Sequence, residues 1–234
     1  MDIKALKLAS LFSYSPNSRG YCGCESAGPA FRECIQNGTC DNVPKELSRF
    51  ITLHPYLQTI GKIRNLPPFD YKVIEAYWIG NDLLKDFPIA GYDVLLEEFM
   101  KQGVPKWLVE SLRVKIPKFF IPHHLFQVLH VGVGQASGSV PFNIYSINNC
   151  MVRHGRILAV TGKTLKISLL GLRLSQAKYL PKIIKLSIPV QTAIFCKPKK
   201  DDVVAIHWGQ VVKILQDDEL KKLELWTRNV LNAL

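Results

Sequence analysis

Acidic residues are missing from a long stretch of this 234-residue chain: none occurs between Glu110 and Asp201. Residues 151–234 carry 15 lysines and arginines against 6 acidic residues, whereas residues 1–150 carry 15 against 13. The formal net charge is +11. Such a positive surface attracts an acidic partner, whether nucleic acid, phosphate or an acidic protein face. The alternative is a chain that is simply basic and uses this charge for no partner.

Several enzyme and membrane signatures are absent as well. The chain has no Gly-x-Ser-x-Gly elbow and no His-Glu-x-x-His motif, and the glycine-rich run 132–138 lacks the Lys-Ser/Thr of a phosphate-binding loop. The longest apolar runs are too short to cross a membrane, and residues 1–12 do not form a signal peptide. We therefore expect a cytoplasmic protein with no membrane partner and no nucleotide-dependent activity.

Cysteine is moderately frequent and unevenly placed. The six cysteines are Cys22, Cys24, Cys34, Cys40, Cys150 and Cys196. The first four crowd the N-terminal region, but their spacing is not a standard zinc pattern. In a cytoplasmic protein, free thiols or metal ligands are expected rather than a disulfide framework. Cys22 and Cys24 are therefore only secondary candidates for metal ligands.

The hydrophobic periodicity predicts an α+β protein that begins with helices. Residues 1–45 are rich in turn formers, so we expect a loop there apart from a short helix at 3–12. Helical patterns follow at 45–57, 71–84, 92–102 and 106–114. Asp70 is a predicted N-cap. Residues 46–130 are thus expected to be mainly helical.

The period changes beyond the Gly/Ser-rich stretch 132–139, which we interpret as a hinge. Segments rich in β-branched residues predict strands within 144–160, 164–172, 183–195 and 203–214, and residues 217–234 return to a helical repeat. The resulting hypothesis has two domains. Residues 1–140 form a mainly helical domain with a Cys/Gly/Pro-rich N-terminal loop, and residues 141–234 form a small OB-like β-barrel plus a C-terminal helix.

Two short motifs in the last third carry the clearest chemistry. The first is Cys150-Met-Val-Arg-His-Gly155, and the second is Asp202-Val-Val-Ala-Ile-His207-Trp-Gly209. A cysteine thiolate is a soft ligand and imidazole a borderline one, so together they suit iron. Three flanking cations could lower the pKa of the thiol and attract anionic ligands, namely Arg153, His154 and Arg156. The alternative is a buried cysteine and a core histidine without a metal.

The C-terminal third, about residues 145–232, resembles the HypC/HupF family of small chaperones of [NiFe]-hydrogenase maturation. The matching residues are Cys150, Gly155, Ile157, Asp202, His207 and Gly209. The resemblance implies transfer of an Fe(CN)2CO group, with the cysteine contacting iron and the histidine assisting. It also implies a protein partner, either a maturation factor or the hydrogenase large subunit. In that family the cysteine becomes N-terminal and proline usually stands at the position of His154, whereas Cys150 is internal.

The whole chain is also similar to a bacterial and archaeal domain family to which no activity is assigned. The landmarks are Pro16-Asn17, Gly20-Tyr-Cys-Gly23, His54-Pro-Tyr-Leu57, Val73-Ile-Glu-Ala-Tyr-Trp-Ile-Gly-Asn81, Pro122-His-His-Leu-Phe126 and Cys150 to Gly155. They extend nearly from end to end. This resemblance implies family membership and no particular chemistry.

Other residues support rival hypotheses. His123 or His124 could join Cys22, Cys24 or Glu75 around a metal in a metal-dependent enzyme, although a histidine after proline often caps a helix.

A polar pocket beside aromatics is predicted by Glu75, Trp78 and Asn81, which share one helical face, but core packing with a capping asparagine explains the same pattern. A basic OB-like barrel could instead bind single-stranded nucleic acid. Tyr179 and Phe195 are the only aromatic residues in 151–200, which is few for base stacking.

Overall fold

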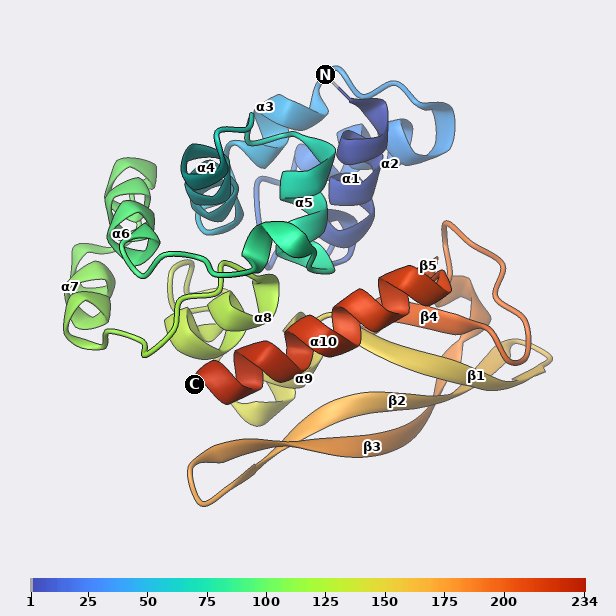
Figure 1. Cartoon of the computed structure of the whole chain (residues 1–234). Helices are drawn as coiled ribbons and strands as arrows, with labels where there is room; N and C mark the ends of the chain where they lie inside the picture. The colour runs from blue at the N-terminus through green and yellow to red at the C-terminus, as the bar shows by residue number, and fades with distance from the viewer. Residues whose placement is uncertain (1) are drawn as a thin grey trace.

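The computed structural model describes residues 2–234 and has an α+β architecture, with helices first, then a sheet, then a long C-terminal helix (Figure 1). The helical part contains α1 (Ile3–Asn17), α2 (Ala27–Asn37), α3 (Val43–Leu47), α4 (Leu53–Arg64), α5 (Tyr71–Trp78), the 3-10 helix η1 (Asp82–Leu84), α6 (Gly91–Gln102), α7 (Lys106–Val114), α8 (His124–Phe126), the π-helix η2 (Gln127–Gly132) and α9 (Ile144–Cys150). The rest contains β1 (Arg153–Thr161), β2 (Thr164–Ser175), β3 (Lys178–Pro189), η3 (Val190–Thr192), β4 (Val203–His207), β5 (Gln210–Ile214) and α10 (Asp217–Ala233). The predicted α+β class and the order of helical region, strands and C-terminal helix are confirmed.

The N-terminal region is more helical than its composition suggests. Helix α1 continues to Asn17 instead of ending at Phe12, and α2 occupies residues for which a loop was predicted. The carboxylate of Asp2 accepts a hydrogen bond from the N–H of Lys4 at 2.8 Å and so caps α1. Helix α2 is held by burial of Phe31 and by packing against α1. Tertiary packing therefore outweighs the local preference of Gly, Pro and Ser for turns.

Two predicted helices are interrupted. The helix expected over 45–57 is divided between α3 and α4, because residues 48–52 form turns. The helix expected over 71–84 ends at Trp78, since Gly80 adopts a φ of 94° that a right-handed helix cannot continue. Its predicted N-cap is confirmed, because the Asp70 carboxylate accepts a hydrogen bond from the N–H of Lys72 at 2.8 Å.

The five strands form one antiparallel sheet in the order β3-β2-β1-β4-β5. Within residues 2–234, β3 and β5 are unpaired edges, so the closed OB-like barrel expected from the sequence is not seen. The strand predicted from residue 144 begins only at Arg153, because Asn143 caps a helix there by accepting from the N–H of Ser146 at 2.9 Å. Strand β3 begins at Lys178, earlier than predicted.

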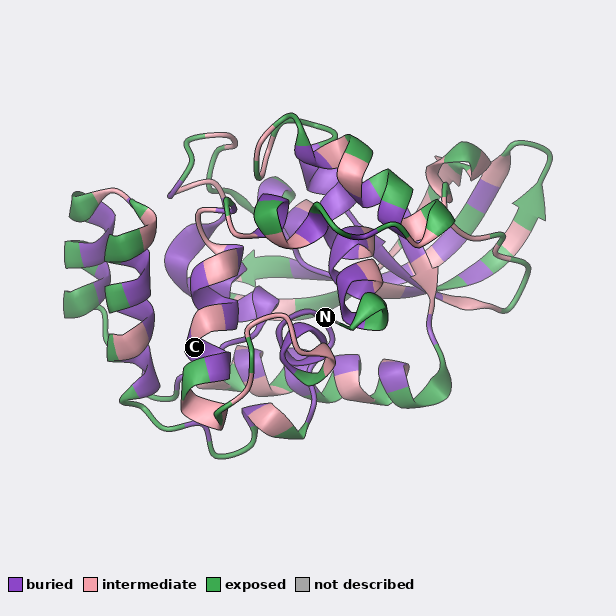
Figure 2. Ribbon diagram, turned by 90° about the horizontal axis from the view of Figure 1, so that it is seen from above, coloured by how far each residue is buried: buried purple, intermediate pink, exposed green. Residues whose placement is uncertain are grey.

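One large hydrophobic cluster joins the helical region to the sheet and α10, with members from Ala5 to Val230. Figure 2 shows buried residues on the faces where these elements meet and exposed residues on their outer faces. A second, smaller cluster lies on one face of the sheet and contains Ile157, Leu165, Ile167, Leu169, Val204, Ile206 and Val211. Because the large cluster includes residues from both sides of position 140, the two predicted domains share a core. The boundary itself stays a prediction.

Cys34 and Cys40 form a disulfide, contrary to the expectation of free thiols. Helix α2 ends at Gly38 in the left-handed conformation, and this turn returns the chain so that the two cysteine Cα atoms lie 4.4 Å apart. The other four cysteines are free. Among the described residues, no helix combines the length and the apolar character needed to cross a membrane.

Candidate metal centre

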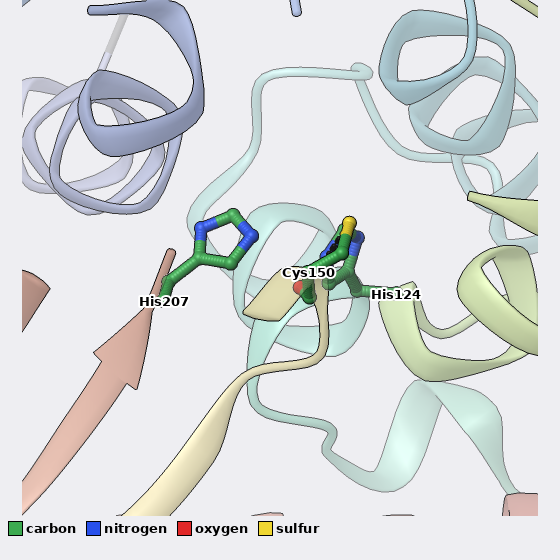
Figure 3. A group of neighbouring side chains, drawn as sticks. All are labelled: His124, Cys150 and His207. Atoms are coloured by element: carbon green, nitrogen blue, oxygen red, sulfur yellow. Dashed lines mark hydrogen bonds between the residues drawn. The ribbon is translucent and has the colours of Figure 1, made fainter. Parts of the chain in front are cut away.

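Three potential metal ligands converge in the interior: His124, Cys150 and His207. Their ligand atoms all lie within 4.8 Å of one another, and no other group of three such side chains is found among residues 2–234. Each of the three residues is at most 4% exposed. Figure 3 shows the imidazole of His207 turned toward Cys150 and His124. The structure thus brings together the predicted pair and adds one of the two adjacent histidines.

The fold explains why these residues meet. Cys150 is the last residue of α9, and β1 begins three residues later and pairs with β4, whose last residue is His207. The N–H of Trp208 donates to the carbonyl of Asn149 at 2.7 Å, which fixes the end of β4 beside the end of α9. His124 begins α8, from the helical part of the chain. Three separate segments therefore each place one donor at the same point.

The distances are close to those of a metal site. The Sγ of Cys150 lies 3.8 Å from the Nε2 of His124. A tetrahedral zinc-like site with bonds of about 2.3 Å to sulfur and 2.0–2.1 Å to nitrogen separates these atoms by about 3.5 Å. Closing that difference requires only a small movement of these two side chains, and all three donor separations are within 4.8 Å. The donor set therefore fits a soft or borderline metal ion.

His207 is already oriented for coordination. Its Nδ1–H donates to the carbonyl of Phe12 at 2.8 Å, while its buried Nε2 faces the backbone of Cys150 without forming a hydrogen bond of normal geometry. Metal-bound histidines usually have this arrangement, with a backbone carbonyl holding the ring through the second nitrogen. Burial lowers the pKa of His207 well below its ordinary value, and the neighbouring His124 lowers it further. The ring is therefore neutral at pH 7, as a ligand must be.

His124 is held by a polar relay inside the core. Its Nδ1 lies 2.9 Å from the hydroxyl of Tyr77, and Tyr77 donates to the amide oxygen of Gln127. With that donation, the Tyr77 oxygen accepts from Nδ1–H, so Nε2 carries a lone pair. In the other tautomer, Nε2–H donates to the carbonyl of Cys150 at 2.8 Å. Burial lowers the pKa of His124 to about 4, and metal binding at Nε2 would select the first tautomer.

The Cys150 thiol has a raised pKa, not the lowered one expected from its basic neighbours. Burial raises the pKa well above its usual value, Cys22 raises it further, and the indole N–H of Trp208 lowers it. The expected cations act elsewhere, because Arg156 donates to the carbonyl of Asp201 at 3.0 Å and His154 lies 3.4 Å from Glu224. A metal would therefore have to displace the thiol proton.

Arg153 is buried, and its Nε has no hydrogen-bond partner. Desolvation lowers the pKa of this guanidinium to about 10, so it stays charged at pH 7. Its positive charge contributes to lowering the pKa of His207. Arg153 thus favours the neutral form of one candidate ligand and does not assist the thiol.

A cavity of about 350 Å³ reaches Cys150 from the surface. Its wall includes the 20–24 loop, the 132–140 loop and the side chain of Trp208, whose indole N–H has no oxygen or nitrogen acceptor. Cys22 and Cys24 therefore line the approach to the centre and do not belong to its three donors. Burial raises the pKa of Cys22 to about 12. A small ligand could reach the sulfur of Cys150 by this route.

The remaining predicted residues have structural contacts. His123 caps α8 by accepting from the N–H of Leu125 at 3.1 Å, so the capping alternative describes it. Glu75 accepts from Asn81 at 2.8 Å and pairs with Lys222 at 2.8 Å, which connects α5 to α10.

Trp78 packs against both histidines of the centre, with ring centroids 4.5 Å from His124 and 5.5 Å from His207. It also stacks on Phe12, with ring centroids 5.1 Å apart. Sequence reasoning gave no role to Tyr77 or Gln127, because only the fold places them beside His124. The aromatic content of 73–81 was the available signal for a buried wall here.

The comparisons with known proteins agree with the whole-chain resemblance. Residues 4–234 match the model of a family described as a family of unknown function, DUF6390, and the chain belongs to that family. No curated protein and no solved structure matches the chain. Any activity must therefore be argued from the site itself.

Proposed function

We propose that this protein is an accessory protein that binds a soft transition-metal ion, or a preformed iron group, through His124, Cys150 and His207. The observation that supports this most strongly is His207, whose buried Nε2 forms no hydrogen bond of normal geometry while its Nδ1 is held by a backbone carbonyl. An unpartnered buried nitrogen costs free energy unless something satisfies it. A metal shared with Cys150 and His124 would do so.

Three protein donors leave one position of a tetrahedral metal unfilled. Structural zinc sites have four protein ligands, whereas sites that bind exogenous groups have three. The cavity at Cys150 offers about 350 Å³ for such groups. This combination favours a protein that carries a metal with non-protein ligands over one that uses a metal only for stability.

The more specific proposal is a role in [NiFe]-hydrogenase maturation, in contact with a maturation factor or the large subunit. It rests on the HypC/HupF-like spacing of Cys150 and His207, and iron is the metal that this resemblance implies. The open sheet would correspond to a variant of the small barrel of those chaperones. The internal position of Cys150 means that side-chain donors, with His124 added, replace any contribution from a chain terminus.

Cobalt(II) titration of the metal-free protein tests the donor set. We expect one equivalent to bind with thiolate-to-cobalt charge-transfer absorption and the intense visible bands of tetrahedral cobalt. Cys150→Ala should abolish the charge-transfer band, and His207→Ala should lower the affinity. Cys196→Ala is the matched control, because this free thiol belongs to the far face of the sheet and should leave the spectrum unchanged.

Iron content after anaerobic purification tests the biological metal. We expect iron in the wild-type protein and in Cys196→Ala, and a loss of most of it in Cys150→Ala. Equal iron in all three proteins would refute the assignment of Cys150. Circular dichroism of each variant separates loss of a ligand from loss of the fold.

A further inference from the structure

A second and larger hollow lies away from the metal centre. It has a volume of about 1110 Å³ and lies between the C-terminal half of α10, the tip of the β2–β3 hairpin and the segment 115–118. Figure 1 shows the hairpin tip and the end of α10 on the same side of the molecule. We call this hollow the α10 groove. It exceeds the roughly 300–1,000 Å³ of pockets that hold small molecules.

Four cations line the α10 groove, and none of them forms an ion pair within residues 2–234. They are Lys115, Lys118, Lys178 and Arg228. Glu224 is the one acidic side chain in the lining, and it lies 3.4 Å from His154. All four cations are exposed. The cationic side chains of the lining therefore outnumber the acidic ones, which favours a partner of negative charge.

The α10 groove is also lined by exposed apolar side chains, which distinguishes it from an ordinary charged surface facing solvent. Ile116 is 68% exposed and Phe142 is 42% exposed, and both line it together with Leu170, Tyr179 and Leu231. Contiguous exposed apolar residues rimmed by charge are typical of sites that bind another protein. The occupant should therefore offer both apolar side chains and negative charge.

We infer that the α10 groove binds an acidic, amphipathic segment of a partner protein. Charge complementarity to the four cations requires a negatively charged partner, and the aliphatic side chains of the lining favour a peptide over nucleic acid. Only two aromatic side chains, Phe142 and Tyr179, line the groove, whereas single-stranded nucleic acid binds along series of stacked rings. This surface is independent of the metal donors. The groove and the metal donors are connected only along the chain. Helix α8 carries His124, and η2, which follows it directly, contributes Leu129 and His130 to the groove.

Fluorescence anisotropy with three defined probes tests the inference on the full chain. The first probe is a fluorescein-labelled peptide of alternating Glu and Leu pairs, and the second has Gln in place of Glu. The third is a labelled fifteen-nucleotide oligo-dT. We expect the Glu-Leu peptide to bind at least tenfold more tightly than the other two, with an affinity that falls as salt rises.

Charge-reversal variants locate the binding. Lys178→Glu with Arg228→Glu should weaken the Glu-Leu peptide at least tenfold, which is about 1.4 kcal/mol. Lys163→Glu with Lys200→Glu is the matched control, because both lysines are exposed and lie outside the groove. It should change the affinity less than twofold. Both doubles should still bind cobalt, so failure here is distinguishable from failure of the metal proposal.

Three results would overturn the inference. One is equal weakening by the groove and control variants, which would indicate diffuse attraction to a basic surface. Another is equal affinity for the Gln-Leu peptide, which would remove the role of charge. The last is tighter binding of oligo-dT than of the Glu-Leu peptide, which would favour nucleic acid.

Discussion

Gly80 lies against Trp226 of α10, and this contact allows a sharp test of the packing. Gly80 follows α5 with a φ of 94°. A Cβ added there would lie 2.1 Å from Cδ1 and 2.4 Å from Cγ of Trp226 on α10. Trp226 is only 5% exposed, so its indole has little room to move. Gly80→Ala therefore combines backbone strain with overlap in a packed interface.

The two contributions can be separated. Placing alanine in the left-handed region costs about 1–2 kcal/mol, and overpacking a core costs about 1–3 kcal/mol more. Gly103 at the end of α6 has a similar φ of 84° but nothing within 4 Å of an added Cβ. Gly103→Ala should therefore lower the free energy of unfolding by the strain alone. Gly80→Ala should lower it by a further ~1–3 kcal/mol.

Urea unfolding followed by far-ultraviolet circular dichroism measures the difference between the two variants. If the slopes with denaturant agree, the difference in midpoints gives the packing contribution directly. Equal destabilisation of the two variants would show that α10 does not press on Gly80 as described. The contact between Gly80 and Trp226 would then contribute nothing to the stability of the fold.

Two further predictions concern pH and redox state. Burial lowers the pKa of His130 from its ordinary value of 6.5 to about 4. As the pH falls below 6.5 the unfolded chain therefore gains a proton on this residue, whereas the folded chain takes it up only near pH 4. The contribution of neutral His130 to the free energy of unfolding is fully present above pH 6.5, and about 3 kcal/mol of it is lost by pH 4. His130→Gln should therefore show a smaller decline in unfolding free energy over that range. An unchanged decline in the variant would show that His130 is not responsible for it. Reducing the Cys34–Cys40 disulfide with dithiothreitol should lower the unfolding free energy by about 2 kcal/mol. The control is a Cys34→Ala/Cys40→Ala variant, whose unfolding free energy should not respond to the reductant. No change in the wild-type protein would refute the presence of the disulfide.

The sequence was sufficient for elements whose pattern is local. The Asp70 cap, the helices over 92–102 and 106–114 and the helix after residue 217 follow from capping residues and from apolar spacing, and all are present within a residue or two. Prediction from the sequence failed where tertiary contacts determine the local structure. Helix α2 is stabilised by packing on α1, and α9 replaces the start of a predicted strand because its N-cap outweighs β-propensity. Whether the sheet closes into a barrel depends on pairing between its two edge strands, β3 and β5, and the local sequence pattern carries no information about that pairing.

The candidate centre was predicted in part, for a related reason. Cys150 and His207 were recognised from their motifs, but only the fold distinguishes His124 from its neighbour. Adjacent residues at a helix start point in different directions. Both side chains are buried. His123 caps α8, whereas the Nε2 of His124 lies beside the Sγ of Cys150. The raised pKa of the Cys150 thiol was not predicted, because cations that are near in the sequence do not reveal whether the thiol is buried.

The hydrogen bond from His207 to the carbonyl of Phe12 joins residues 195 positions apart. Its consequence concerns the order of events during synthesis and folding. The ring of His207 acquires its orientation only after β4, made late, has docked against α1, made early. If these residues bind a metal as proposed, the complete donor set would form only in a chain in which β4 has docked against α1. Loading would report that the two distant parts of the polypeptide have assembled correctly.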